Sequence, residues 1–126
     1  MAGYSNAHRK WLNELRFLWH EAVIADERMA RRSVVLRLAG YIMHKFHIDL
    51  GYVQFSAGSA AKSLGIDKRQ LKRAKRYLEE HGWLKRRNHG KATFGWQAEC
   101  YELGGGPNKI DFQARRGKPK ISVPEG

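Results

Sequence analysis

The sequence predicts a mainly α-helical fold with one small β-hairpin, and three observations support this class. Apolar residues recur at spacings of three and four over residues 5–46, which is typical of amphipathic helices. Residues 56–84 contain two short helical segments with a glycine turn between them. Residues 83–103 alternate apolar and polar side chains around a turn at residues 88–90, which is typical of a hairpin.

The first expected helix covers residues 5–25, with Ser5 or Asn6 as its cap. One apolar stripe runs along it and contains Trp11, Leu12, Leu15, Leu18, Trp19, Ala22 and Val23. Two interpretations stay equally open: the stripe packs on the rest of the chain, or it forms a homodimer interface or docks a protein partner. Both hold if the helix packs within the chain and leaves a seam for a second subunit.

A second helix is expected from Asp26, its cap, to about Phe46. It is apolar on more than one side, so we expect it to be central. Its first apolar face contains Val35, Leu38, Ala39, Ile42 and Phe46, and Met29, Leu36 and Met43 lie on another side. His44 and His47 have the spacing of two metal ligands, with Asp49 as the only close third ligand. Histidines favoured by the helix dipole explain the pair better, so no metal site is predicted.

A short strand is expected at residues 52–55, followed by the two short helices. Ser56 is the expected cap of the first, and Gly65 ends it because glycine accepts a positive φ. Asp67 begins the second, and Gln70 follows at the spacing of a capping box. Gly82 ends this second helix, whose core side contains Leu71, Ala74 and Leu78.

The other side of that second helix is strongly basic. Its cations form one exposed stripe on a 3.6-residue period, namely Lys68, Arg69, Lys72, Arg73 and Arg76. Lys75 lies at the margin of this stripe. Like charges four residues apart destabilise a helix, so a polyanion that neutralises them explains the pattern. The major groove of duplex DNA accepts an α-helix.

The segment after Gly82 completes the predicted fold. One strand begins at Trp83, and the returning strand lies between Thr93 and Leu103, with a slip in the alternation near Glu99. Gly104–Pro107 predicts a flexible linker, and the basic tail beyond it is expected to be disordered. That tail either lies along a DNA groove or aids solubility.

These residues resemble a known family. Leu-Gly-Ile-Asp at 64–67, Gln-Leu at 70–71 and Leu-Glu-Glu-His-Gly-Trp-Leu at 78–84 are similar to the helix-turn-helix of winged-helix proteins. Many bacterial and phage regulators and plasmid replication proteins carry that motif. The resemblance implies a winged helix-turn-helix domain over residues 26–103, preceded by an extra amphipathic helix in residues 1–25 and followed by a flexible basic tail, 104–126. It implies a fold more specifically than a role.

Composition narrows the function. The chain has 24 Lys and Arg against 12 Asp and Glu, a net charge of +12. Residues 62–91 hold eleven of these cations and three acids, a net of +8, which is typical of a nucleic-acid-binding surface. Cys100 is the only cysteine, so an intrachain disulfide and a multi-cysteine zinc site are excluded. No signal peptide, membrane span or catalytic motif is apparent, so we expect a cytoplasmic non-enzyme without cofactors, in the bacterial cytoplasm or nucleoid.

The predicted function is sequence-specific binding of double-stranded DNA by a transcriptional regulator, in the first place a repressor. A replication or recombination accessory factor of a plasmid or phage is the alternative on the same chemistry. An RNA- or ribosome-binding module would instead stack unpaired bases on Trp83, Phe94 and Trp96. A protein adaptor that uses the N-terminal helix is the remaining alternative.

The predicted site follows from these elements. The second short helix, which begins after Asp67, is the one expected to enter the major groove. Residues near the start of such a helix reach deepest into the groove, so Arg69, Gln70 and Arg73 are expected at base edges. Phosphate contacts are expected from Lys68, Lys72, Arg76, Arg86, Arg87, His89 and Lys91. Ser56 and Ser59, at the start of the preceding helix, are expected to donate to a phosphate as well.

Overall fold

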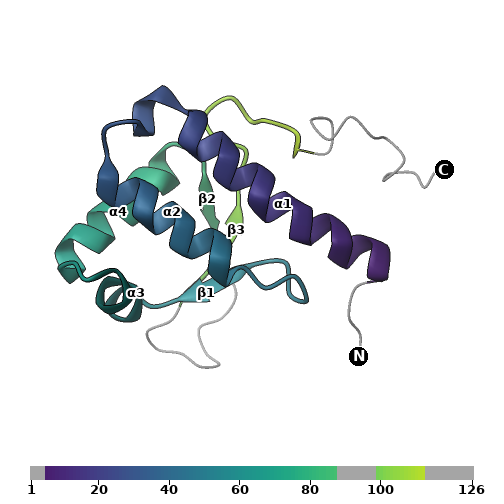
Figure 1. Cartoon of the computed structure of the whole chain (residues 1–126), viewed down its shortest axis with the longest axis horizontal. Helices are drawn as coiled ribbons and strands as arrows, with labels where there is room; N and C mark the ends of the chain where they lie inside the picture. The colour runs from purple at the N-terminus through teal and green to yellow at the C-terminus, as the bar shows by residue number, and fades with distance from the viewer. Residues whose placement is uncertain (1–4, 88–98, 113–126) are drawn as a thin grey trace.

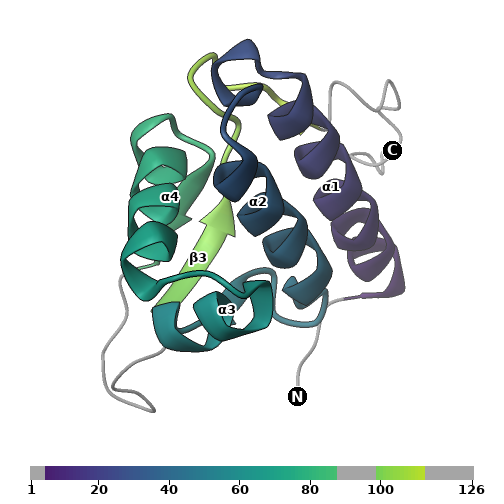
Figure 2. The same cartoon turned by 60° about the vertical axis from the view of Figure 1, so that its left-hand side comes forward.

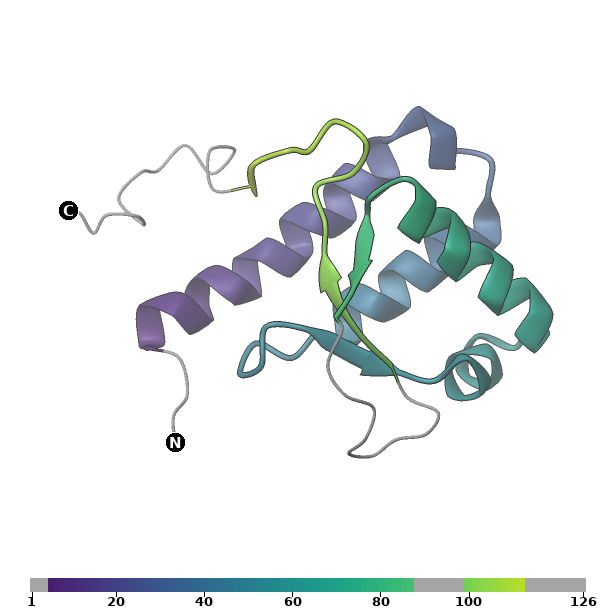
Figure 3. The same ribbon diagram turned by 180° about the vertical axis from the view of Figure 1, so that it is seen from behind.

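The computed structural model describes residues 5–87 and 99–112. Its helices are α1 (Asn6–Ala25), the 3-10 helix η1 (Glu27–Met29), α2 (Ser33–Lys45), α3 (Ala57–Leu64) and α4 (Lys68–Glu80). Its strands β1 (Val53–Phe55), β2 (Leu84–Arg86) and β3 (Glu99–Leu103) form an antiparallel sheet in the order β1-β3-β2. α1 and α2 lie in front of the sheet in Figure 1 and behind it in Figure 3. The predicted class, mainly helical with a small antiparallel sheet, is confirmed.

α1 belongs to the core of the chain itself. Ser5 caps it, because the Ser5 hydroxyl accepts a hydrogen bond from the His8 amide at 3.1 Å. The helix runs beside α2 (Figure 2), and the buried Trp19 donates from Nε1 to the Trp83 carbonyl oxygen at 2.9 Å. The predicted stripe therefore packs within the chain, as one of the two interpretations expected.

Part of α1 also stays apolar and exposed. Phe17 and Ile24 are 50% and 51% exposed, and their spacing of seven places them on one side of the helix. A homodimer through residues 5–25, or a protein partner on that helix, stays a prediction.

The expected helix from Asp26 to Phe46 is divided in two. Asp26 caps only the short η1, with its Oδ1 accepting from the Arg28 amide at 2.9 Å, and α2 begins at Ser33 without a side-chain cap. The Asp26 carboxylate also accepts from the Arg28 side chain at 2.9 Å and from Trp83 Nε1 at 3.0 Å. These bonds fix a turn at this point, which holds Met29 fully buried. Burial alone raises the pKa of Asp26, but the bonds outweigh it, so its pKa is lowered.

The segments around α3 form as predicted. β1 pairs with β3 in the register Val53↔Tyr101, and the Ser56 hydroxyl accepts from the Ser59 amide at 3.1 Å to cap α3. Gly65 ends α3 with φ +68°, the left-handed conformation that glycine adopts without penalty. α4 follows at once, so α3 and α4 are joined by a tight turn.

Residues 104–112 pack against the core, whereas the sequence suggested that a flexible linker begins there. The Gly104 amide donates to the Trp83 carbonyl oxygen at 2.9 Å, and the Gly106 amide donates to that of Gly82 at 3.0 Å. Gly106 has φ +81°, and a Cβ atom there would lie 2.6 Å from Trp83 Cζ2. These glycines therefore allow a close approach to the indole ring rather than free motion. Phe112 is buried at the end of this segment, and the rest of the tail lies outside the described residues.

Candidate nucleic-acid interface

α4 separates apolar residues from basic ones. Leu71, Ala74 and Leu78 are buried against neighbours that include α2 and α3. The five residues of the predicted stripe are all exposed, namely Lys68, Arg69, Lys72, Arg73 and Arg76. Within residues 5–87 and 99–112, none of these five forms an ion pair with an acidic side chain. The stripe is therefore a surface of uncompensated positive charge.

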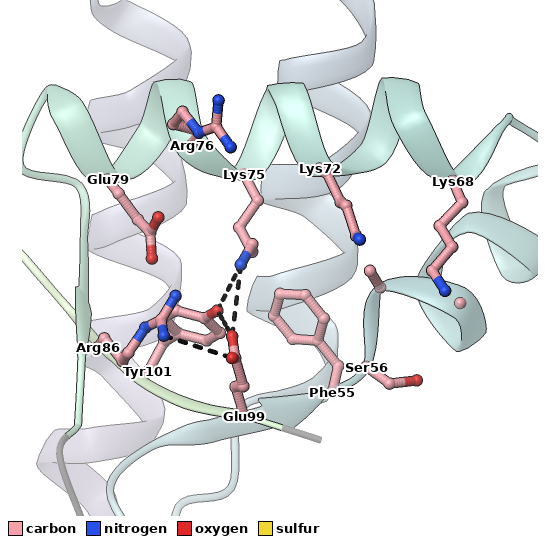
Figure 4. A pocket seen from close by; sticks show the side chains of 12 residues that line it. Phe55, Ser56, Lys68, Lys72, Lys75, Arg76, Glu79, Arg86, Glu99 and Tyr101 are labelled. Atoms are coloured by element: carbon pink, nitrogen blue, oxygen red, sulfur yellow. Dashed lines mark hydrogen bonds and ion pairs between the residues drawn. The ribbon is translucent and has the colours of Figure 1, made fainter. Parts of the chain in front are cut away.

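Lys75 differs from the stripe residues because it is bound to the sheet. Its ammonium donates to Tyr101 Oη at 2.7 Å and lies 3.4 Å from Glu99 Oε1 (Figure 4). Only 14% of its side chain is exposed. Lys75 therefore connects α4 to β3, and it lines the groove beside them with its charge already paired to Glu99.

Glu99 joins Lys75, Tyr101 and Arg86 in one cluster. It accepts a hydrogen bond from Tyr101 Oη and pairs with Arg86 Nη1 at 3.4 Å. The hydrogen bond from Tyr101 lowers the pKa of Glu99, burial opposes this, and Lys75 and Arg86 lower it further. Burial and the adjacent carboxylate raise the pKa of Tyr101. The cluster thus holds an ionised Glu99 beside a neutral Tyr101.

Arg86 and Arg87, which are expected to contact phosphates from the predicted hairpin, already have acidic partners. Arg86 pairs with Glu99, and Arg87 Nε lies 3.8 Å from Glu102. The Arg87 guanidinium also lies 4.5 Å from the centroid of the Tyr52 ring. Part of their charge is therefore compensated, in contrast to the stripe on α4. His89 and Lys91, the other two expected phosphate contacts in this hairpin, lie outside the described residues.

A groove of about 460 Å³ lies between α4 and the sheet. Lys68 and Lys72 extend from α4 toward the start of α3, where Ser56 lies (Figure 4). Arg76 and Arg86 also line the groove. The structure thus brings five predicted residues together around one concave surface. Ser59 is exposed on α3 but does not line the groove, and Arg69 and Arg73 lie outside it.

Gln70 has a structural task that limits its predicted role. Its Oε1 accepts a hydrogen bond from the Asp67 amide at 3.2 Å, as part of a capping box at the start of α4. A base contact by Gln70 therefore has to use the amide nitrogen, or has to break the cap.

A second group of cations lies at the turn between η1 and α2, where no sequence pattern suggested a site. The Arg32 guanidinium lies 4.0 Å from the centroid of the Tyr77 ring, on α4. Tyr77 Oη donates to the carbonyl oxygen of Arg28 at 3.2 Å. The sequence does place three arginines close together, at positions 28, 31 and 32. The contact between Arg32 and Tyr77, however, joins residues that are 45 positions apart, so local sequence patterns could not predict it.

Trp83 cannot serve as the stacking platform of an RNA-binding module. Its side chain is 2% exposed, and its indole N–H donates to Asp26. Phe94 and Trp96, the other two aromatics considered for that role, lie outside the described residues. The described aromatic residue therefore supports the core and not base stacking.

Other kinds of site were also sought in residues 5–87 and 99–112. There, no three His, Cys, Asp or Glu side chains gather as ligands for a metal ion. In the same residues, no helix has the length and apolar character needed to cross a bilayer. Comparisons of the chain with models of protein families, with curated proteins and with solved structures found no match.

Proposed function

We propose that this protein binds double-stranded DNA with sequence specificity, through a winged helix-turn-helix in which α4 enters the major groove. The observation that carries the proposal is the row of five exposed cations on α4 without acidic partners in the described chain. An α-helix with its side chains is about 10–12 Å wide, and the major groove is about 12 Å wide. A helix of this kind therefore fits the groove and is stabilised by the phosphates around it.

The residues of α4 divide by direction into two roles. Arg69 and Arg73 are exposed and do not line the concave surface, so we assign them to base edges on the floor of the major groove. Lys68, Lys72 and Arg76 line the concave surface toward the sheet and bind phosphates. Arg86 and Arg87 contribute less than the stripe, because a phosphate has to compete with Glu99 and Glu102.

The biological role that we assign is transcriptional repression by occupancy, in which the bound protein excludes other proteins from its site. A homodimer through α1 would double the contacts and would require an inverted repeat in the DNA. The spacing of the two halves of that repeat then reports the distance between the two copies of α4.

The first test is selection of bound duplexes from a random DNA pool, carried out at about 50 mM and about 200 mM salt. We expect one motif to be enriched at both concentrations. An inverted repeat would indicate a dimer, and a single half-site would indicate a monomer. Binding without enrichment that disappears at the higher salt concentration would refute sequence specificity.

A matched pair of variants tests the two roles on α4. Arg73→Ala and Lys72→Ala each remove one exposed cation from adjacent positions of the helix. We expect Arg73→Ala to lose about 1–3 kcal/mol on the selected duplex and little on random DNA. Lys72→Ala should weaken both duplexes alike and reduce the slope of log K against log salt by about 0.9. Equal losses on both duplexes for both variants would contradict the division of roles.

A further inference from the structure

The turn between η1 and α2 contacts α4 at Tyr77, a residue that does not line the groove between α4 and the sheet. The Tyr77 hydroxyl bonds to the Arg28 carbonyl oxygen, and the Arg32 guanidinium lies on the Tyr77 ring, 4.0 Å from its centroid. Tyr77 follows Arg73 by four residues, so the two lie one above the other on the same side of α4. Arg32 is thus placed next to the flank of the basic stripe.

This turn carries two cations without acidic partners. Arg31 and Arg32 are exposed, and neither forms an ion pair within the described parts of the chain. Arg28 is different, because its Nε pairs with Asp26 at 2.9 Å. The turn lies beside α4 in both Figure 1 and Figure 2. Arg31 and Arg32, named here the turn arginines, therefore extend the positive surface beyond α4.

A helix in the major groove has a phosphate backbone on each side. Because the helix is nearly as wide as the groove, both of its flanks face phosphates. On one flank, Lys68 and Lys72 face the start of α3 across the concave surface. On the other flank, the Arg32 guanidinium is held against α4 by the Tyr77 ring, and Arg31 precedes Arg32 in the same exposed turn.

We propose that the turn arginines bind phosphates of the strand on this second side, so that α4 is held between two phosphate contacts. The inference rests on the proposed function and adds a second binding surface to it. Tyr77 is a positioning residue: a guanidinium stacked on an aromatic ring keeps the N–H groups at its edge free, and that edge binds phosphate with two hydrogen bonds.

The test compares two double variants that remove the same charge. Arg31→Gln/Arg32→Gln removes the turn arginines. Lys10→Gln/Lys45→Gln removes two exposed lysines. Lys10 lies near the start of α1, and Lys45 is the last residue of α2, whereas Arg32 directly precedes the first residue of α2. Lys45 is a close match to Arg32, because it also lies over a tyrosine ring, 5.7 Å from the centroid of Tyr41. Binding of each protein to the selected duplex is measured between about 50 and about 200 mM salt.

Two lost phosphate contacts lower the slope of log K against log salt by about 1.8. Both proteins lose affinity when the salt concentration rises fourfold. The factor by which the arginine variant loses affinity should be about 12 times smaller than the factor for the wild type. The lysine variant should keep the wild-type slope. Footprinting should show that protection of phosphates on one strand beside the α4 contact is lost only in the arginine variant.

A third variant changes no charge. Tyr77→Leu removes the ring under Arg32, and we expect it to lower the slope by about 0.9, whereas Tyr77→Phe keeps the ring and the slope. If the wild type binds its selected duplex and the arginine variant keeps the wild-type slope and footprint, the inference is refuted and the proposed function stands. An equal change in the lysine variant also refutes it, because net charge alone then explains the effect. If the wild type selects no duplex, both proposals fail.

Discussion

Gly106→Ala is the substitution that most sharply tests how the end of the described chain is held. Gly106 has φ +81°, and a Cβ atom there would lie 2.6, 2.7 and 2.8 Å from three carbon atoms of the Trp83 ring. The indole cannot move away freely, because its N–H is bonded to Asp26 and its side chain is buried. The substitution therefore combines backbone strain with a steric clash.

The two contributions can be worked out separately. Placing alanine in a left-handed conformation costs about 1–2 kcal/mol, and an extra methyl group in a packed site costs about 1–3 kcal/mol. Gly106→Ala should therefore lower the free energy of unfolding by about 2–5 kcal/mol. Gly65→Ala is the matched control: its φ is +68°, and an added Cβ atom would meet nothing within 4 Å. It should show the backbone cost alone, about 1–2 kcal/mol.

Urea unfolding followed by tryptophan fluorescence measures both variants, and equal m-values show that the two-state comparison is valid. If residue 106 lay in a flexible linker, its substitution would change stability by less than about 0.5 kcal/mol. A result in that range, or a Gly106→Ala cost no larger than that of Gly65→Ala, would refute the packing of residues 104–112 on Trp83.

Three further predictions concern the core, the charged cluster and the cap of α3. Trp19→Phe should lower the free energy of unfolding by about 1.5–3 kcal/mol, because it removes a hydrogen bond and buried volume. Phe17→Ala, on the exposed side of α1, is the control and should cost less than about 0.5 kcal/mol. Equal costs for the two variants would contradict the burial of Trp19. The lowered pKa of Glu99 means that its ionised form stabilises the fold above its ordinary value of 4.5 and that this contribution is lost as the pH falls below that value. Glu99→Gln should therefore show a smaller loss of stability than the wild type between about pH 5 and about pH 3, as measured by urea midpoints at each pH; parallel curves would show that the carboxylate contributes nothing. Ser56→Ala should cost about 1 kcal/mol in thermal or urea unfolding, with Ser63→Ala on the same helix as a near-neutral control, and an unchanged midpoint for Ser56→Ala would contradict the cap.

Local patterns were sufficient for most helices and for the turn between α3 and α4. The periodic apolar residues of α1 and α4, the cap at Ser56 and the left-handed Gly65 are all determined by neighbours within one or two turns. The five stripe residues were predicted to be exposed for the same reason, since their positions follow directly from the helical period.

The features that were not predicted depend on contacts between distant residues. The turn after Asp26 is fixed by a hydrogen bond from Trp83, 57 residues further along the chain. Lys75 was expected at the margin of the basic stripe, but its binding to Glu99 and Tyr101 depends on the position of β3. The glycines at 104–106 have the composition of a linker, and only the nearby Trp83 ring explains why small residues are needed there.

The Trp83 carbonyl oxygen joins both ends of the described chain at a single atom. It accepts one hydrogen bond from the Trp19 indole and another from the Gly104 amide, each at 2.9 Å. During synthesis on a ribosome, α1 emerges long before its partner at residue 83, and residue 104 follows later still. The helical pairs can form early, but closure of the core has to wait until the segment ending at Phe112 has left the exit tunnel. Until that moment the apolar stripe of α1 lacks part of its cover.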